Sequence, residues 1–502
     1  MDFFQSILFG LQVCLQPINL LYCFIGVLIG TLIGVLPGIA PSGTIAILLP
    51  VTYHAPPVSS IIMLAGIYYG ALYGGSTTSI LVNIPGEPAS IVTCLDGHQM
   101  AREGRAGPAL GISAFGSFIA GTIGIIGLML LAQPLASFAL KFGPPEYFSL
   151  MVLGLVMIAY LSQRSLIRSI MMATLGLILS YVGLDIVSGQ SRFTFELDEL
   201  LEGVGVVPMA MGLFGIAEVF ENLEEKIERS LFKTHIEGLL PTLKDWSDSI
   251  GAIIRGTFIG FFLGILPGGN ALIASFMSYA LEKKLSKHPE RFGKGAIAGV
   301  AGPESANNAA SSGAFLPLLT LGIPSNVVMA MLFAGLLIHN IRPGPLLLQQ
   351  HPDLFWGVII SMYVGNVMLL VLNLPLIRMW VQITKVPFLF LYPLIILFCV
   401  IGVYSINNSI FDLWIMFVFG MVGYLLRKCD YEPAPLVLAY VLGPMLEQAM
   451  RQSLLISNGN FMIFLVRPIS GSCLAAATLL LVLSGVKYAK KKRLQSQQET
   501  MT

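Results

Sequence analysis

The stretch Gly26-Val-Leu-Ile-Gly30-Thr-Leu-Ile-Gly34-Val-Leu-Pro37-Gly38 decides the fold, because its pattern occurs a second time far along the chain. The second copy reads Gly256-Thr-Phe-Ile-Gly260-Phe-Phe-Leu-Gly264-Ile-Leu-Pro267-Gly268. Three glycines, a leucine and the Pro-Gly pair fall at a constant offset in the two copies. Glycines four residues apart favour close helix packing, and Pro-Gly either kinks or breaks a helix. The duplication favours two matching breaks.

Composition places these breaks in a membrane. Of 502 residues, 55% are hydrophobic and only 11% are charged, whereas a soluble domain carries roughly 25% charged residues. Apolar runs of about 20 residues recur from end to end. A net charge of +1 gives no indication of nucleic acid binding, and six scattered cysteines without a Cys-x-x-Cys pair indicate neither a disulfide framework nor a metal site. The N-terminus lacks the basic segment of a cleaved signal peptide.

Loop charge predicts the topology, because basic loops stay in the cytoplasm. The basic segments are 98–105, 164–168, 226–244, 283–294, 427–428 and 487–493. The segments that are poor in Lys and Arg, and therefore expected outside, are 53–60, 185–202, 339–353 and 404–412.

About eleven spans satisfy this assignment and end on a cytoplasmic C-terminus. They are predicted at 61–84, 110–133, 146–161, 169–184, 203–220, 299–323, 354–380, 388–402, 413–426, 433–445 and 469–486. Two apolar segments remain, 21–50 and 251–281, and each holds one Pro-Gly break. Both are flanked by loops assigned to one side, which predicts re-entrant hairpins.

A second, weaker match follows the hairpins. Gly74 precedes Ile84-Pro85 by the same spacing that separates Gly313 from Ile323-Pro324, and both stretches are unusually polar for a span. We therefore expect an all-α polytopic membrane protein with two inverted repeats, each with one broken hairpin and about five spans. The expected parts are a first repeat at 1–220, a cytoplasmic connecting segment at 221–250, a second repeat at 251–445, and a C-terminal span with a basic tail at 446–502. Inverted repeats with broken helices are typical of secondary transporters.

Several further motifs resemble those of one family. They are Gly34-Val-Leu-Pro-Gly-Ile-Ala-Pro-Ser-Gly43, Tyr69-Gly-Ala-Leu-Tyr-Gly-Gly75, Asn83-Ile-Pro-Gly86, Leu95-Asp-Gly97, Phe292-Gly-Lys-Gly295, Gly302-Pro-Glu-Ser-Ala-Asn-Asn-Ala309, Leu319-Thr-Leu-Gly-Ile-Pro324 and Ile456-Ser-Asn-Gly-Asn460. Over nearly its whole length the chain resembles the large membrane subunit, TctA type, of tripartite tricarboxylate transporters. Two positions depart from the family pattern, Ala296 after Gly295 and the pair Ser325-Asn326 after Pro324.

The resemblance implies a permease of the bacterial inner membrane that works with a small membrane subunit and a periplasmic solute-binding protein. It implies transport of a small carboxylate, a tricarboxylate or related organic acid, driven by an ion gradient without ATP. Neither a cofactor nor a catalytic residue is expected, and the coupling ion is sodium or a proton.

A carboxylate that leaves water needs new hydrogen-bond donors, and a helix that restarts after a break offers free backbone N–H groups. No Lys or Arg lies near either break. We therefore expect substrate to be bound by dipoles and polar side chains around both breaks. The candidate substrate-binding residues are Pro37, Gly38, Ser42, Thr77, Thr78, Asn83, Gly268, Asn270, Ser325 and Asn326.

Glu304 is the outstanding acid, because it begins a polar run in a predicted span. Intramembrane acids are functional by default, and hard cations take oxygen ligands. The candidate ion-coupling residues are Glu304, Asn307, Asn308, Ser311 and Glu87, with a sodium ion expected near Glu304 and Asn308. Helix capping at the membrane interface is the competing interpretation for Glu304 and Glu87.

Two other classes of function compete with this one. A stand-alone organic-anion permease or channel would need no binding protein, and a channel would need a continuous pore, which duplicated breaks do not favour. An intramembrane enzyme would need a nucleophile and a base at depth, yet no Asp lies inside a predicted span. The sequence leaves open which carboxylate is carried, which ion is coupled and whether the chain forms homo-oligomers.

Overall fold

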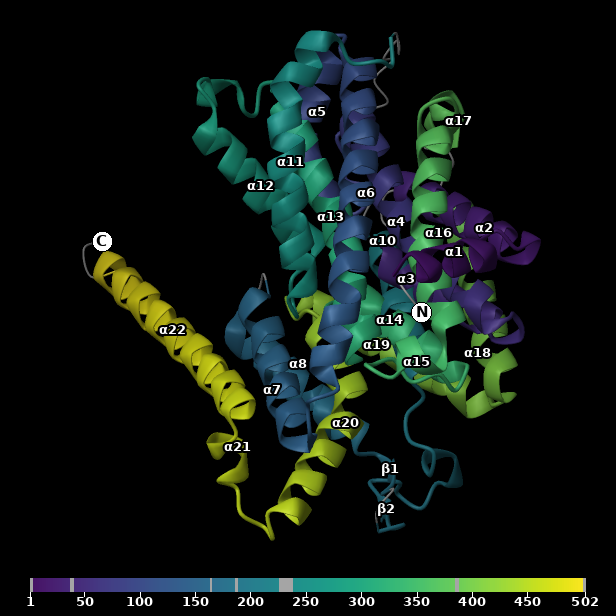
Figure 1. The fold of residues 1–502 in the computed structure, drawn as a ribbon, viewed down its shortest axis with the longest axis vertical. Coiled ribbons are helices and arrows are strands. Elements are labelled where there is room, and N and C mark those ends of the chain that lie inside the picture. The colour runs from purple at the N-terminus through teal and green to yellow at the C-terminus, as the bar shows by residue number, and fades with distance from the viewer. Residues whose placement is uncertain are drawn as a thin grey trace. The chain divides into compact units, whose positions relative to one another are not determined.

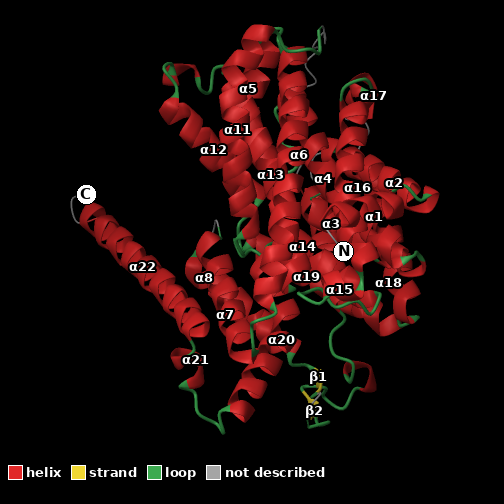
Figure 2. Ribbon diagram, in the orientation of Figure 1, coloured by secondary structure: helices red, strands yellow, loops and turns green. Residues whose placement is uncertain are grey.

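The chain is helical almost throughout in a computed structural model (Figures 1 and 2). The structure describes residues 3–36, 40–162, 165–185, 188–224, 238–383 and 388–499, with the backbone alone at 388–391, 485 and 487–499. Within these ranges, eight helical segments are long and apolar enough to span a membrane. They are α2 (Pro17–Val35), α4 (Pro57–Val82), α6 (Ala106–Ala139), α7 (Pro144–Leu161), the run α9–α10 (Val206–Glu224), α11 (Leu243–Ile265), α16 (Pro352–Asn373) and α19 (Ile410–Lys428). The chain is a polytopic membrane protein.

Further helices and turns complete the fold. The α-helices are α1 (Phe3–Cys14), α3 (Pro41–Leu48), α5 (Ile91–Arg102), α8 (Leu166–Ser180), α9 (Val206–Ala210), α10 (Ala217–Glu224), α12 (Ala271–Leu285), α13 (Ala298–Leu321), α14 (Val327–Ile338), α15 (Leu347–Gln350), α17 (Ile377–Ile383), α18 (Phe388–Asn407), α20 (Ala434–Ile456), α21 (Ile463–Val466) and α22 (Pro468–Glu499). The 3₁₀ turns are η1 (Pro50–His54), η2 (Pro88–Ser90), η3 (Asp198–Leu200) and η5 (Pro289–Arg291), and Met211–Ile216 is π-helical.

The structure differs from the expected elements at several places. Two short antiparallel strands, β1 (Gly183–Leu184) and β2 (Ser191–Arg192), depart from a purely helical fold (Figure 2). Helix α1 was not predicted. The span expected at 354–380 ends at Asn373, because Pro375 cannot donate the next helical hydrogen bond. The span expected at 433–445 continues to Ile456, so the repeat boundary placed at 445 falls inside α20.

The described helices group into two compact units. The first comprises residues 1–139, 205–265 and 269–425, and the second comprises 140–204, 266–268 and 426–502. The first unit therefore holds both predicted polar-lined spans, as α4 and α13, and most of both predicted hairpins.

Within the first unit, the repeated glycines bring two helix pairs into backbone contact. On α2, a Cβ added to Gly26, Gly30 or Gly34 would overlap the carbonyl oxygens of Met63, Ile67 and Ala71 on α4. On α11, the same addition to Gly256, Gly260 or Gly264 would overlap the carbonyl oxygens of Gly302, Ala306 and Ala310 on α13. Within each set, the partner residues are four residues apart. Each partner on α13 follows its counterpart on α4 by the same number of residues. Glycine is therefore required on each face because the backbones touch.

The reverse contact is matched as well. A Cβ on Gly74 of α4 would overlap the Thr31 carbonyl oxygen on α2, and a Cβ on Gly313 of α13 would overlap the Phe261 carbonyl oxygen on α11. Thr31 and Phe261 occupy the same position in the two copies of the glycine pattern. The pairs α2–α4 and α11–α13 are thus packed in the same register.

Both polar helices also end in the same way. Asn83 ends α4 with a φ of 60° and Gly322 ends α13 with a φ of 71°, the left-handed conformation that commonly terminates helices. An Ile-Pro pair follows each, and then an N-cap. Glu87 accepts a hydrogen bond from the backbone N of Ala89 at 2.9 Å, and Asn326 accepts one from that of Met329 at 3.0 Å.

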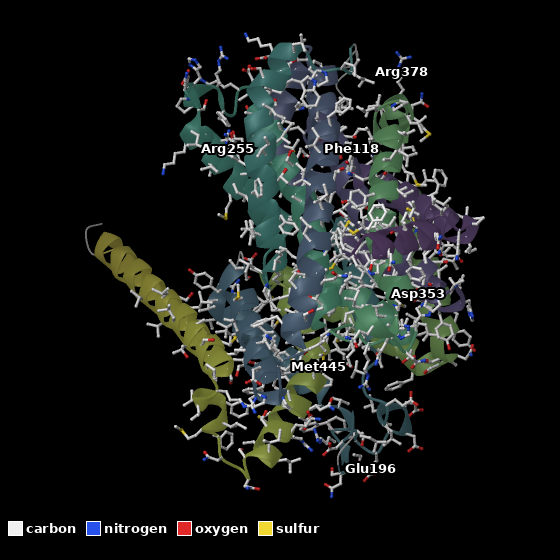
Figure 3. All side chains as sticks on the ribbon, in the orientation of Figure 1. Phe118, Glu196, Arg255, Asp353, Arg378 and Met445 are labelled. Carbon is white, nitrogen blue, oxygen red and sulfur yellow. The ribbon has the colours of Figure 1, made fainter. Side chains whose placement is uncertain are left out.

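The second hairpin is clamped near its open end. Its limbs α11 and α12 lie side by side (Figure 1). Arg255 of α11, labelled in Figure 3, donates from Nε at 2.8 Å and from Nη2 at 2.6 Å to the carboxylate of Glu282 on α12. Such a two-pronged ion pair fixes the limbs relative to each other.

Candidate coupling site

Glu304 is the centre of a buried polar cluster in the first unit. The residue is fully buried on α13, and its carboxylate accepts hydrogen bonds from hydroxyl groups of three other helices. Ser76 of α4 donates at 2.6 Å, Thr93 of α5 also donates, and Ser113 of α6 is a further hydroxyl partner. Asn307 adds a longer contact at 3.5 Å. Gly116 of α6 lies close to α13 beside Glu304, since a Cβ there would be 3.1 Å from Ser305 Oγ.

Asn308 extends the cluster one turn along α13. Its side-chain nitrogen donates to Ser117 Oγ on α6 at 2.8 Å, to the Glu304 backbone oxygen at 3.1 Å and to Asn307 Oδ1 at 2.5 Å. The structure therefore brings together three of the predicted ion-coupling residues. Ser311, in contrast, donates to the Asn308 backbone oxygen of its own helix at 2.7 Å, as hydroxyls in buried helices often do.

Glu87 is a second buried acid close to the first. The Oε2 atom of Glu87 caps η2. The Glu87 side chain also packs tightly on α4, because a Cβ on Gly75 would lie 2.8 Å from Glu87 Cγ. Among the described residues, no hydrogen-bond partner reaches Glu87 Oε1. The charges of Glu87 and Glu304 interact. Capping, the competing interpretation for Glu87, thus accounts for only one of its two oxygens.

The chemistry of this cluster suits a small hard cation or a proton. The cluster offers carboxylate, hydroxyl and amide oxygens, the ligand types that sodium and similar ions prefer. In the part of the chain that the structure describes, no Lys or Arg pairs with Glu304. An ionised carboxylate at this depth is costly unless a positive charge joins it.

The other candidate substrate-binding residues lie in three places. Thr77 and Thr78 are buried on α4, where Thr78 donates to the Gly75 oxygen of its own helix at 3.2 Å. Asn83 is exposed at the end of α4. Ser325 is fully buried, and among described residues its hydroxyl has no partner, whereas Asn326 caps α14 and contacts the Tyr68 hydroxyl at 3.4 Å.

The hairpin residues form a separate group. Pro37 and Gly38 lie outside the described residues. Ser42 sits in the first turn of α3 and is half-buried. Gly268 has a φ of +80°, and Asn270 caps α12 by accepting from the Ile273 backbone N at 2.9 Å. Within the described ranges, no hydrogen bond joins Ser42 or Asn270 to the cluster around Glu304.

Glu218 is a buried acid that the sequence analysis missed. Its Oε1 accepts a hydrogen bond from the backbone N of Ala40 at 2.5 Å, just before α3 begins. A Cβ on Gly43 would lie 2.9 Å from Oε2. A carboxylate therefore occupies the positive end of α3. The π-helical turn Met211–Ile216 directly precedes α10, and such turns often mark functional sites. A small, partly open depression, with room for about one water molecule, lies beside Glu218 and is lined by Gly43, Ile47, Gly215, Val219, Asn222, Tyr392 and Ile395.

Asp96 is a second missed acid, and it explains two motifs. Its Oδ1 accepts three backbone N–H groups at 2.8 Å, from Gly293, Gly295 and Ala296, and its Oδ2 accepts from the Tyr279 hydroxyl at 2.9 Å. Asp96 thus ties α5 to α12 and to the loop before α13. The loop contributes only backbone at 296, so the departure from the family pattern there leaves this contact intact.

A simple signal could have found some of these residues. Ser113 and Ser117 are four residues apart in an otherwise apolar run and therefore share one helix face. Glu218 is the first acid after the apolar run that begins at Gly205. Thr93 carries no such signal, because its role depends on where α5 packs.

Comparison with known proteins agrees with the resemblance seen in the motifs. Residues 20–438 match the model of the tripartite tricarboxylate transporter TctA family. An uncharacterized 52.8 kDa protein in the TAR-I ttuC' 3'region of Agrobacterium vitis is 50% identical over 493 residues, covering 98% of each chain. An uncharacterized protein in the TAR-II ttuC' 3'region of the same organism is 48% identical over 47% of this chain and 97% of its own length. No solved structure matches. The chain therefore belongs to the tripartite tricarboxylate transporter TctA family, a family of multi-pass membrane transporters rather than enzymes.

Proposed function

We propose that this chain is the permease subunit of a secondary transporter that imports a small carboxylate and is driven by an ion gradient. A periplasmic binding protein delivers the substrate, and a small membrane subunit completes the complex in the bacterial inner membrane. The C-terminus lies in the cytoplasm. The observation that carries the proposal is the Glu304 carboxylate, fully buried and hydrogen-bonded by hydroxyls of α4, α5 and α6. Family membership supplies the transport class.

The cluster couples ion to substrate through charge. An ionised Glu304 repels an arriving carboxylate strongly in a site of low dielectric constant. A sodium ion held by Glu304, Asn307 and Asn308, or a proton on Glu304, removes that repulsion. Glu87 is a second buried acid whose charge interacts with that of Glu304, so a cation held at Glu304 also lowers the cost of an ionised Glu87. Binding of the ion therefore raises the affinity for the substrate and, by linkage, binding of the substrate raises the affinity for the ion, which is the coupling that symport uses.

The substrate anion is held at the N-termini of helices that begin after a break. Asn270 and Asn326 cap α12 and α14, and each leaves further backbone N–H groups in the first turn. The end of α3 differs, because Glu218 already occupies it. Pro37, Gly38, Ser42, Thr77, Thr78 and Ser325 remain candidate contacts around these ends.

Alternating access takes place between two inverted repeats. The pairs α2–α4 and α11–α13 share their glycine register, their left-handed helix ends and their caps. This agreement supports a duplicated unit, and the odd number of spans that loop charge assigns to each copy makes the second copy inverted. In such transporters the substrate lies where the repeats meet.

Uptake into proteoliposomes tests the proposal. The complete complex is reconstituted with its binding protein, and uptake of radiolabelled carboxylates is measured with a sodium gradient, a proton gradient or neither. Glu304→Gln should abolish uptake or uncouple it from the ion. The control is Glu290→Gln, because Glu290 is exposed in the α12–α13 loop. Uptake that continues after both gradients collapse, or that needs no binding protein, would refute the proposal.

A further inference from the structure

The loop that follows β2 displays large apolar side chains to solvent. Phe193 is 59% exposed and Phe195 is 81% exposed, and Leu197 next to them is also exposed. The loop lies in the second unit and belongs to the segment whose charge predicts an outer location. We call Phe193–Glu199 the aromatic tip. Figure 3 labels Glu196 on this tip.

The backbone of the tip is strained. Phe193, Phe195 and Glu196 have φ values of 52°, 50° and 64°, a region that bulky residues rarely adopt. Each such residue costs about 1 kcal/mol or more, so the surrounding structure must hold the tip in place. Thr194 between the two aromatic residues is buried, and its carbonyl accepts from the Leu197 backbone N at 2.9 Å. This turn points both phenylalanine rings outward. Strain of this kind concentrates at functional sites.

A closed ring of four charged residues fixes the base of the tip. Arg192 pairs with Asp185 at 2.6 Å and with Glu447 at 3.0 Å. Arg451 pairs with Asp185 at 3.2 Å and with Glu447 at 2.7 Å. Glu447 and Arg451 lie on α20, so the ring ties the strands to a helix of the same unit. The tip is therefore preorganised, which lowers the entropy lost when a partner binds.

The charge around the exposed rings selects the kind of partner. Glu196, Asp198, Glu199 and Glu202 are all exposed on or beside the tip. Anionic lipid headgroups repel such a surface. A protein with an apolar pocket and a rim of Lys and Arg fits it, because exposed aromatic residues commonly anchor protein interfaces and complementary charge speeds docking.

We propose that the aromatic tip is the docking surface for the solute-binding protein, whose contact face carries an apolar pocket rimmed by basic residues. Phe195 enters the pocket, and the acidic residues orient the partner. This assignment rests on the proposed function, which places the loop outside and supplies the partner.

Direct binding tests the assignment. The purified complex in nanodiscs is titrated with the purified solute-binding protein of the same transporter, at low and high salt. Phe195→Ser should raise the Kd at least tenfold, as expected for an aromatic anchor. The double change Glu196→Gln and Glu199→Gln should slow association and flatten its salt dependence. Leu346→Ser is the matched control, since Leu346 is an exposed apolar residue of another outer loop.

The outcomes separate the two proposals. If wild type does not bind the solute-binding protein and its uptake does not need it, the proposed function fails. If wild type binds but Phe195→Ser binds as tightly as Leu346→Ser, the tip is not the docking surface. Phe195 is so exposed that its loss removes little packing, and an unchanged thermal unfolding temperature confirms that the variant is folded. A loss of nanodisc stability without a change in Kd would instead assign the rings to the lipid surface and overturn the proposal.

Discussion

Adding one methyl group to Gly260 should disrupt the pairing of α11 with α13. The Cβ of Gly260→Ala would lie 2.7 Å from the Ala306 carbonyl carbon and 2.8 Å from its Cα, and closer still to the carbonyl oxygen. Ordinary contact begins at 3.4 Å, so the Ala306 carbonyl carbon alone requires a separation of about 0.7 Å and the nearer carbonyl oxygen requires more. All three neighbouring atoms are backbone, which cannot rotate away.

Two opposing effects set the magnitude. Replacing glycine by alanine inside a helix gains about 1 kcal/mol from helix propensity. Forcing an extra carbon into a packed contact costs about 1–3 kcal/mol. With backbone on both sides, the cost lies at the upper end, and we expect a net destabilisation of about 1–2 kcal/mol. Gly30→Ala should behave in the same way, because Ile67 presents its backbone to α2 as Ala306 does to α11.

Thermal unfolding in detergent measures this effect. A thiol-reactive fluorophore reports unfolding as the buried Cys14, Cys23 and Cys399 become accessible. The control is Gly154→Ala on α7, where the nearest atoms, of Pro267, lie at 3.7 Å. This control should unfold at the wild-type temperature or above it. If Gly260→Ala is as stable as Gly154→Ala, the packing argument is wrong.

Three other predictions follow from the buried polar groups. Thr93→Val removes a hydrogen bond to the Glu304 carboxylate and should shift the ion concentration for half-maximal uptake about tenfold, upward if sodium loses an oxygen ligand and downward if Glu304 carries the coupling proton and now holds it more tightly. Thr320→Val, whose hydroxyl bonds its own helix, should leave this concentration unchanged, and equal values in the two variants would contradict the coupling role. Asp96→Ala frees three backbone N–H groups and should speed tryptic cleavage after Lys294 severalfold, and a wild-type cleavage rate would show that Asp96 does not restrain this loop. Glu218→Gln keeps an acceptor for Ala40 but removes a charge from the end of α3, so the KM for the carboxylate should fall; an unchanged KM would place substrate away from this helix end.

The sequence predicted the fold where the signal was repeated. The glycine repeats that begin at Gly26 and Gly256 predicted close helix packing. The structure confirms this packing, because each of these glycines lies against a backbone carbonyl group of the neighbouring helix. The polar run on α13 stood out because asparagine and glutamate are rare in apolar helices, and the run on α4 stood out because four hydroxyl residues follow one another there. The clustering of Glu304 with Asn307 and Asn308 follows from their spacing on one helix.

The rest of the site could not be predicted, because it depends on contacts between distant segments. Thr93 and Ser113 become partners of Glu304 only when α5 and α6 pack on α13. From the sequence, Glu218 lies near the end of the span predicted at 203–220 and gives no sign of a buried contact. In the structure, a π-helical turn precedes Glu218, and its carboxylate lies beside the backbone N of Ala40. Helix α1 has 12 residues, too few to span a membrane, so the length of its apolar run carries no signal.

The ring of Arg192, Asp185, Glu447 and Arg451 has a consequence for the timing of biosynthesis. Arg192 and Asp185 are translated 255 and 266 residues before their respective partners Glu447 and Arg451 on α20. At about 5–20 residues per second, this interval lasts on the order of ten to fifty seconds. Over that time Asp185 and Arg192 lack the α20 partners that the finished protein gives them. A nascent chain halted before α20 would therefore be a good substrate for quality-control proteases, and the second unit should acquire protease resistance only after the C-terminal helices have been inserted.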